Sequence, residues 1–327
     1  MNRIEIALAV VTILAVCWGA AADTEYKYAG EFLNVGAGAR ALGMGGAFVA
    51  VADDGTTAYW SPGGLSSLQS REVAFMHSQQ FDNLVKTNYI GYVHPTSHWG
   101  TFGISWLRLG VEDIPKTGYV DSNGNLKQDF VDENDNGAKD PGEMYIELPA
   151  VVGYFDDVED GIFLSYGAQL SENFSAGANL KIIRQSMSAH SSSGYGIDIG
   201  ALYQLFDGFK VGLNLQDVPR TRIKWDLTNH EDEIPFSVRA GAAYTGQIPS
   251  LMSIFTISFA VDTKYDTETH YGAEWWLVRT LALRLGLDEG ELSAGCGLRV
   301  ATFQVDYAFI GHDDLGSTHR ISTSVQF

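Results

Sequence analysis

The sequence predicts an all-β protein, an antiparallel transmembrane β-barrel of 14 strands whose interior holds a glycine-rich N-terminal plug. Three observations support this prediction. Apolar and polar residues alternate through most of residues 70–327, six glycines fall between Gly36 and Gly55, and an alternating run ends the chain on Phe327. The mature chain also lacks an apolar run of the ~18 residues that a transmembrane helix requires.

An export signal is predicted for residues 1–22. Arg3 supplies a positive start, residues 4–18 are mostly apolar, and Ala20-Ala21-Ala22 provides an A-x-A cleavage site. A lipoprotein signal acylated at Cys17 is the alternative. Removal of the signal leaves Cys296 as the remaining cysteine, so no intramolecular disulfide is expected.

Residues 23–69 are predicted to form the plug. Glycine allows close backbone approach and positive φ, but its entropic cost means that a segment so rich in it must be held by its surroundings. The rival interpretation is a dinucleotide-binding fingerprint, because Gly36–Ala41 fits G-x-G-x-x-A. That motif needs a preceding strand and a following βαβ pattern, which this chain lacks. The residues expected to shape or orient the plug are Arg40, Gly43, Met44, Gly45, Gly46, Asp53, Asp54, Ser61, Pro62 and Gly63.

The barrel, residues 70–327, is predicted from alternation. Even-numbered residues from Phe174 to Ile182 are apolar, and odd-numbered residues from Tyr195 to Leu205 are apolar. These faces carry no charge, as expected of a lipid-facing wall, where a cation at mid-membrane costs roughly 2–4 kcal/mol. The opposite faces are polar or small, as in a wet lumen. A soluble β-sandwich also alternates and is the alternative.

We predict an even number of strands, 14, as single-chain bacterial barrels require. An apolar patch at Ala150–Tyr154 would break this parity and is assigned to a loop. The long connections 111–160 and 217–233 are expected outside the cell, opposite the C-terminus and the short turns at 171–173 and 207–208. The strands are placed at residues 71–81, 85–95, 99–110, 161–170, 173–187, 194–206, 208–216, 234–245, 251–264, 269–278, 280–287, 291–300, 302–311 and 317–327.

The last strand carries a second signal. Ile321, Val325 and Phe327 lie on its apolar face, and the pattern resembles the insertion signal that the outer-membrane barrel assembly machinery reads. The net charge of −19 disfavours nucleic acid as a partner. Together these features predict residence in the outer membrane of a Gram-negative-type bacterium, with outer-membrane lipid as the surrounding partner.

A calcium site is predicted in the acidic loop 111–160, which has 14 Asp and Glu residues against 3 Lys. Residues 132–143 fit D-x-[DN]-x-[DN]-G-x₅-E, a spacing that places oxygen ligands around Ca²⁺. Asp121, Asn123, Asn125, Asp129 and Asp132 repeat the spacing upstream without its glycine, as a second, weaker site. A solvated acidic loop is the alternative. The ligands expected for a structural Ca²⁺ are Asp132, Asn134, Asn136, the Ala138 carbonyl, Asp140 and Glu143.

No catalytic constellation is found, and the protein is not expected to be an enzyme. Charged residues fall on predicted lumen faces, and we interpret them as an ion-pair network that holds the plug, with a substrate path as the alternative. Arg40 and Asp53-Asp54 are the partners expected on the plug side. The wall residues are Asp198, Arg239, Asp262, Lys264, Glu274, Arg284, Arg299 and Asp306.

The runs Gly38–Ala41, Gly43–Phe48, Asp53-Asp54 and Tyr59–Leu65 resemble the PorV/PorQ group of outer-membrane proteins, which belongs with the FadL-like channels. The resemblance implies a surface partner in type IX protein secretion, with secretion cargo as a contact. The alternative is a FadL-like channel for hydrophobic molecules, and a third possibility is a structural barrel. Ser61-Pro62-Gly63 replaces the family's Asn-Pro-Ala tripeptide, which lies in the hatch of such channels.

Overall fold

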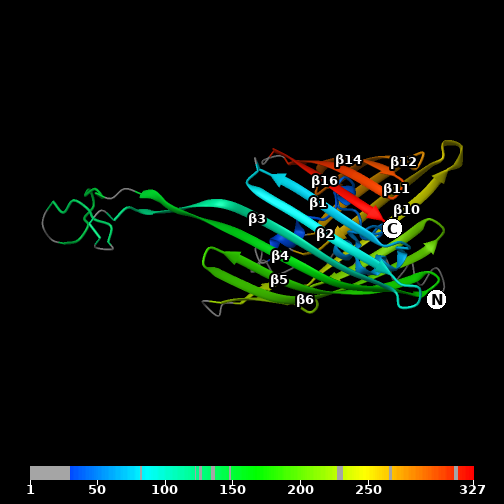
Figure 1. Cartoon of the computed structure of the whole chain (residues 1–327), viewed down its shortest axis with the longest axis horizontal. Coiled ribbons are helices and arrows are strands. Elements are labelled where there is room, and N and C mark those ends of the chain that lie inside the picture. The colour runs from blue at the N-terminus through cyan, green and yellow to red at the C-terminus, as the bar shows by residue number, and fades with distance from the viewer. Residues whose placement is uncertain are drawn as a thin grey trace.

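The computed structural model describes residues 30–81, 83–121, 123–124, 127–133, 137–146, 149–226, 231–264, 267–312 and 316–327. The predicted export signal, residues 1–22, lies outside this part. Among the described residues, no helix is long and apolar enough to cross a membrane. The described chain forms one closed antiparallel β-barrel (Figure 1).

Fourteen described strands make the barrel wall, and each pairs antiparallel with the next. The wall closes where β1 pairs with β16, with Phe75 opposite Thr323. The predicted number and order of barrel strands are therefore confirmed. The wall strands are β1 (Glu72–Gln80), β2 (Val85–Pro95), β3 (Thr101–Tyr119), β4 (Pro149–Ser171), β5 (Phe174–Met187), β6 (His190–Phe206), β7 (Phe209–Gln216), β10 (Ser237–Ile248), β11 (Ser253–Asp262), β12 (Glu268–Leu277), β13 (Leu281–Asp288), β14 (Glu291–Val300), β15 (Phe303–His312) and β16 (Gly316–Gln326).

The prediction of a loop throughout 111–160 was wrong at both ends. β3 runs on to Tyr119 and β4 starts at Pro149, so the patch Ala150–Tyr154 is part of β4 and not a loop or an extra strand. Two register shifts, at 111/114 and 116/117, interrupt the alternation that would have revealed the extension. The extended strands form a ribbon that leaves the barrel at the end opposite the C-terminus (Figure 1).

A second correction concerns residues 217–233. The segment was predicted as a connection, but it contains β8 (Thr221–Trp225) and β9 (Glu231–Ile234). These strands form a small hairpin that pairs with the start of β6, where Tyr195 lies opposite Arg222. The hairpin adds to the rim and not to the closed wall. The remaining helical turn outside the lumen is η4 (Pro249–Leu251).

The apolar faces of the wall point outwards. Leu285 in β13 and Ile197 in β6 are 61% and 47% exposed, whereas their neighbours Arg284 and Asp198 are 2% and 1% exposed. A soluble sandwich buries its apolar faces, so this inversion excludes the sandwich and identifies a lipid-facing wall. The polar faces line the inside of the barrel.

Residues 30–68, which we call the lumen segment, lie against the inner face of the wall. The segment contains four short helices, η2 (Glu31–Asn34), α2 (Ala39–Leu42), α3 (Thr57–Trp60) and η3 (Pro62–Ser67). Helix α2 contacts β14, β15 and β16, while η3 contacts β2 through β7. The segment therefore reaches across the barrel from one side of the wall to the other. Glycine and proline keep its helices to one or two turns.

Candidate functional site: the lumen segment and the wall around it

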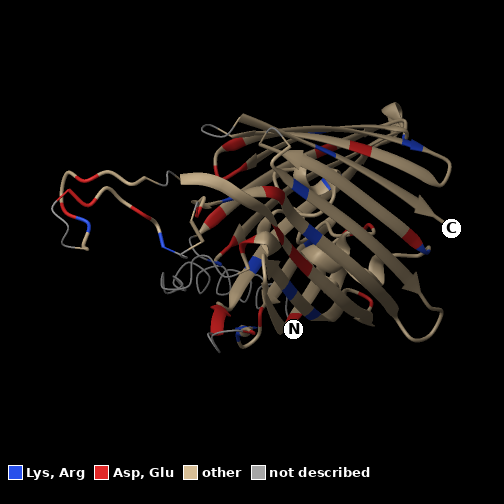
Figure 2. Cartoon of the chain, turned by 60° about the vertical axis from the view of Figure 1, so that its left-hand side comes forward, with Lys and Arg blue, Asp and Glu red and all other residues tan. Residues whose placement is uncertain are grey.

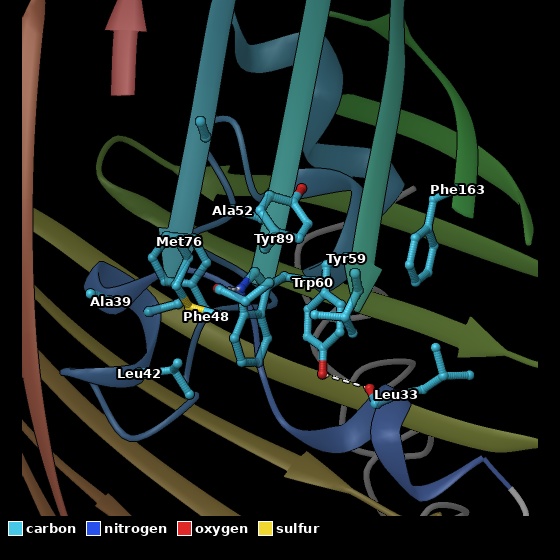
Figure 3. Close-up of a cluster of buried hydrophobic side chains, with 14 of the residues drawn as sticks. Leu33, Ala39, Leu42, Phe48, Ala52, Tyr59, Trp60, Met76, Tyr89 and Phe163 are labelled. Carbon is cyan, nitrogen blue, oxygen red and sulfur yellow. Dashed lines mark hydrogen bonds between the residues drawn. The ribbon is translucent and has the colours of Figure 1, made fainter. Parts of the chain in front are cut away.

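An apolar core holds the lumen segment together. Phe48 and Tyr59 each meet Trp60 edge-on, with ring centroids 6.0 and 5.0 Å away. The Trp60 indole donates to the carbonyl of Ala37 at 2.8 Å, and the Tyr59 hydroxyl donates to the carbonyl of Leu33 at 2.6 Å. Figure 3 shows these rings among wall side chains of β1, β2 and β4, which are Met76, Tyr89 and Phe163. Buried aromatic pairs of this kind each add about 0.5–1.5 kcal/mol beyond the area they bury.

Glycines of the wall let the segment lie directly on the strands. Gly177 of β5 pairs with Gly167 of β4 on one side and with Gly200 of β6 on the other. A β-carbon at Gly177 would lie 2.2 Å from the carbonyl oxygen of Pro62, and one at Gly200 would lie 2.7 Å from the amide nitrogen of Gly63. Real β-carbons do not come so close, so these wall positions have no room for a side chain. We call Gly167, Gly177 and Gly200 the glycine row.

A second contact of the same kind lies on another part of the wall. Gly272 of β12 pairs with Gly286 of β13, and both face Met44 and Gly45. A β-carbon at Gly286 would lie 2.1 Å from the amide nitrogen of Gly45, whose own φ is +60°. Residue 45, predicted as part of the plug, must therefore be glycine, because other residues are strained at this positive φ and their β-carbon would not fit beside the wall. Its neighbour Gly43 similarly abuts Gly295 of β14.

Buried ion pairs connect the segment to the wall. The Arg40 guanidinium forms two hydrogen bonds with the Glu274 carboxylate of β12, at 2.8 and 2.9 Å. It also meets Asp53 at 2.6 Å and Asp54 at 3.2 Å within the segment. Arg284 of β13 reaches Glu274 from the other side at 2.7 Å. The ion pairs expected from the sequence are thus present around Arg40.

Other charged lumen residues pair mainly with one another, and Lys264 also reaches the lumen segment. Lys181 bridges Asp198 at 2.8 Å and Asp217 at 2.5 Å, and Arg239 meets Asp262 at 2.6 Å. Arg284 also meets Asp306 at 2.9 Å, and Lys264 donates to Asn34 of the segment at 3.1 Å. Arg299 instead donates to Gln304. Pairing offsets the cost of removing charges from water, and breaking such a pair leaves that cost uncompensated.

Burial and charge shift the titration of groups in the segment. Burial raises the pKa of the Asp54 carboxyl above its usual 3.8, and Arg40, which lowers it, does not fully offset this effect. Burial likewise raises the pKa of the Tyr59 hydroxyl. Burial alone would lower the pKa of Arg40, but Asp53 and Glu274 raise it well above its usual value. Arg40 is therefore a permanent cation at the centre of this network.

Two asparagines hold the helix that precedes the Ser61-Pro62-Gly63 bend. Asn179 of β5 donates to the carbonyl of Ala58 at 2.7 Å, and Asn214 of β7 donates to the carbonyl of Trp60 at 3.1 Å. Ser61 is extended, with φ −165°, so helix α3 ends there and η3 begins at Pro62. Sequence reasoning did not single out these asparagines. Alternation placed both on lumen faces, but only the fold shows which carbonyl oxygens they meet.

A cavity of about 480 Å³ lies at the ribbon end of the lumen. Leu42, Gly46, Tyr59 and Trp60 line it from the lumen segment. Arg239, Asp262 and Glu268 are among the charged residues that line it from the wall. The lumen segment therefore forms one side of this cavity.

A shallow apolar groove of about 540 Å³ lies on the outer surface of β3, β4, β5 and β6. Its floor includes Asn179, the residue that holds Ala58 from the inner side. The groove and the glycine row therefore occupy opposite faces of the same strands. The apolar side chains around the groove are Phe102, Leu164, Tyr166, Ala178, Leu180 and Ile197.

Four of the predicted calcium ligands, Asp132, Ala138, Asp140 and Glu143, lie at the tip of the ribbon, between β3 and β4. Gly137, with φ +73°, donates its amide to Asp132 at 2.7 Å, and the two Glu143 oxygens accept from the amides of Glu133 and Asp140 at 2.9 and 2.7 Å. Ala138 is described, whereas Asn134 and Asn136 lie outside the described residues. No group of three or more His, Cys, Asp or Glu side chains in the described part is arranged to hold a metal ion. Calcium binding stays a prediction.

The predicted upstream site is likewise incomplete. Asp121 accepts the amide of Gly124 at 2.6 Å, and Asn123 donates to Asp129. Asn125 lies outside the described residues. These contacts close a turn, and the metal that was expected there stays a prediction.

Of the predicted insertion signal, Ile321 and Val325 lie on the closing strand β16, and Phe327 directly follows it. Ile321 and Phe327 are 55% and 63% exposed on the outer surface. The backbone of Phe327 exchanges two hydrogen bonds with Arg71, at 2.9 and 3.2 Å, beside the start of β1. The last residue therefore lies at the seam of the barrel. Its recognition by the assembly machinery stays a prediction.

Comparisons with known proteins agree with this architecture. A model of an uncharacterised protein family, UPF0164, matches residues 9–127. No curated protein matches the sequence. The toluene transporter TbuX of Ralstonia pickettii is similar in structure, with a TM-score of 0.57, 11% identity, and coverage of 89% of this chain and 98% of that chain.

Two further solved structures are similar over the same share of the chain. The toluene transporter TodX of Pseudomonas putida gives a TM-score of 0.54 at 12% identity, covering 89% of this chain and 99% of that chain. The monoaromatic hydrocarbon channel CymD gives 0.53 at 14% identity, covering 89% and 97%. At such low identity these likenesses show the fold alone, a closed antiparallel β-barrel. Membership of the PorV/PorQ group stays a prediction.

Proposed function

We propose that this outer-membrane β-barrel is a FadL-like channel for hydrophobic small molecules. In this proposal the lumen segment, which lies across the interior, acts as the plug, and Ser61-Pro62-Gly63 is the point where the plug moves. The segment packs against opposite sides of the wall, which disfavours a permanently open, water-filled pore. A passage would therefore open only when part of the segment moves.

The observation that carries the proposal is the position of the outer groove. The bend at Pro62 lies on the inner face of the glycine row, and the apolar groove lies on the outer face of the same strands. Ala178, which lines the groove, directly follows Gly177, where no side chain fits on the inner face. A movement of the bend would thus change the wall beside an apolar groove that faces the membrane. An apolar hollow suits a hydrocarbon and gives a polar solute no hydrogen-bond partner.

The second supporting feature is that packing and neutral hydrogen bonds hold the bend, with no ion pair among the described residues. Asn179 and Asn214 hold the carbonyl oxygens of Ala58 and Trp60 just before it. By contrast, two buried, charge-assisted hydrogen bonds join Arg40 to Glu274. A movement at the bend would therefore break no buried ion pair. The likeness to hydrocarbon channels supports the fold in which such a passage would operate.

A reversible cross-link tests the channel. The Ser61 hydroxyl donates to the carbonyl of Leu213 in β7 at 3.5 Å, and Asn214, the next residue of β7, reaches the carbonyl of Trp60, so cysteines at 61 and 214 are close enough to form a disulfide after a small shift. We expect the oxidised Ser61→Cys/Asn214→Cys variant to take up N-phenyl-1-naphthylamine at the rate of cells that lack the protein. Reduction should restore uptake, and the same protein thus serves as its own control. Equal uptake before and after reduction, with the cross-link verified, would refute the channel.

A second candidate is a surface partner in protein secretion, as in the PorV/PorQ group. The long β3–β4 ribbon favours it, because eight residues of β3, 112–119, extend beyond the last pairing with β2. At ~3.3 Å per residue the ribbon reaches roughly 25 Å past the barrel wall. Such a projection is unnecessary for a passage through the lumen but offers a surface to another protein.

The same cross-link separates the two candidates. If the chain serves secretion, the oxidised lock should leave export of the cargo unchanged, and removal of residues 112–156 should abolish it. If the chain is a channel, the oxidised cross-link should block uptake of the tracer, and removal of the ribbon should change uptake little. Persistence of both activities after both changes would leave a structural barrel as the remaining interpretation.

We further propose that the ribbon tip binds a structural Ca²⁺ through Asp132, Asn134, Asn136, Ala138, Asp140 and Glu143. Carboxylate and carbonyl oxygens are the ligands that calcium prefers. The two amide hydrogen bonds that Glu143 accepts support the proposal, because they fix the carboxylate that the sequence pattern assigns as the bidentate ligand.

A further inference from the structure

The two strands of the ribbon have very different free edges. Beyond the barrel, β3 and β4 pair only with each other among the described strands, so each has one edge without a strand partner. β3 leaves β2 after Val111, and β4 joins β5 only from Asp157 onwards. An isolated two-stranded ribbon is marginal in water, and a free edge offers unpaired backbone groups to another chain.

The edge of β3 is protected against pairing. Glu112 and Asp113 carry charges, Pro115 lacks an amide hydrogen, and Lys116 adds a further charge. Asp113 also has φ +57° at a register shift, which twists the strand locally. Charges, proline and bulges are the devices by which proteins keep an edge strand from accepting a further strand.

From Ala150 to Phe155 the edge of β4 carries neither a charge nor a proline, although the second register shift leaves Val152 without a partner on β3. Val151 and Val152 are 51% and 50% exposed, and Tyr154 is 67% exposed. These side chains lie on the ribbon, beyond the wall that contacts lipid. An exposed apolar edge without charges or proline can accept an added β-strand.

Charge indicates what can occupy this edge. In the described parts of the ribbon, 112–119 and 149–156, the acidic residues Glu112, Asp113 and Asp156 stand against Lys116 alone (charges are coloured in Figure 2). A second copy of the ribbon would bring the same excess of negative charge and would be repelled. A basic segment would be attracted. Asp156 and Asp157 lie at the base of the edge, where such a segment would begin.

We propose that the β4 edge, Ala150–Phe155, binds an extended basic segment of a partner protein as an added β-strand. The added strand would continue the line of β5, which ends at Met187, and would lie above the β5–β6 turn. Backbone hydrogen bonds would supply affinity, while Val151, Val152 and Tyr154 would contact alternate side chains of the segment. The inference requires no opening of the lumen and is independent of the proposed channel.

The test uses the full-length protein in lipid nanodiscs and a synthetic peptide of eight alternating lysines and valines. We expect the peptide to slow hydrogen exchange at the backbone amides of Ala150–Phe155. A peptide of the same charge with proline at two central positions should not bind, because it cannot pair along the edge. Absence of protection on β4, or equal binding of the proline peptide, would overturn the proposal.

A matched pair of variants separates strand pairing from simple charge attraction. Val151 on β4 lies opposite Thr117 on β3, so a glutamate at either position adds the same charge at the same height. We expect Val151→Glu to weaken peptide binding about tenfold, equal to 1.4 kcal/mol, despite the added negative charge. Thr117→Glu should leave affinity unchanged or slightly higher. Tighter binding by both variants would show attraction by charge alone, and concentration-dependent dimers without peptide would show a second copy as the occupant; each result overturns the proposal.

Discussion

Arg40 in the lumen segment and Glu274 in β12 are 234 positions apart in sequence, yet they share two hydrogen bonds of 2.8 and 2.9 Å. Glu274 lies between Arg40 and Arg284, and its side chain is 1% exposed. One wall carboxylate therefore balances two buried guanidinium groups. Loss of the Glu274 carboxylate should therefore destabilise both the lumen segment and the wall.

We expect Glu274→Gln to lower the free energy of unfolding by about 3–5 kcal/mol, since it leaves two buried cations without their shared partner. Urea unfolding in lipid, followed by tryptophan fluorescence, measures this change. Glu172→Gln in the exposed β4–β5 turn is the control and should have little effect. A loss below about 0.5 kcal/mol, the range of ordinary surface substitutions, would contradict a central role for Glu274.

The second prediction concerns the pH dependence of stability. The pKa of Asp54 is raised in the folded protein, so the folded state holds this proton to a higher pH than the unfolded state does. The contribution of Asp54 to stability should therefore fall as pH rises from about 3.8 through the folded pKa. Asp54→Asn does not titrate, and its free energy of unfolding relative to the natural protein should be higher at pH 7 than at pH 4. An opposite trend would mean that ionised Asp54 stabilises the fold.

For calcium, we expect Glu143→Ala to weaken Ca²⁺ binding at least about tenfold, because it removes the bidentate ligand assigned by the loop pattern. The barrel itself should stay folded, since the tip lies beyond the wall. Calorimetry on the full-length protein measures binding, and Glu147→Ala, outside the ligand pattern, is the control. If chelator leaves the protease sensitivity of residues 120–148 unchanged, the metal has no structural role there.

Deletion of Phe327 should slow assembly into the outer membrane. The residue ends the apolar face of β16, and its backbone hydrogen-bonds to Arg71 at the barrel seam. Heat-modifiable gel mobility, which distinguishes folded from unfolded barrels, gives the folded fraction. Phe327→Tyr keeps an aromatic ring and should assemble normally. Normal assembly without Phe327 would show that neither the insertion signal nor the seam contact depends on it.

The sequence predicted the 14 wall strands because each wall face obeys a period of two, and lipid demands uncharged outer faces. It missed the strand character of 112–119 and 149–156, where bulges disturb the period and solvent replaces lipid. It also missed the β8–β9 hairpin, whose β9 has four residues, too few for alternation to stand out.

The lumen segment was harder to predict in detail. Its glycines signalled close contact, and its charges signalled ion pairs. Which wall residues meet them depends on strand register, which a single sequence does not specify over such separations. Gly177 and Gly286 thus looked like ordinary strand glycines, although each faces the backbone of the segment.

The seam between β1 and β16 also constrains the order of events during biogenesis. The lumen segment leads into β1 within a few residues, and β1 finds its second partner only when the last strand of the chain is in place. The amide of Ala39 in the segment donates to the Ser322 hydroxyl of that same last strand at 2.7 Å. The lumen segment is therefore enclosed by an open sheet until β16 forms. Pairing of β16 with β1 then closes the barrel, and the same strand hydrogen-bonds to the lumen segment.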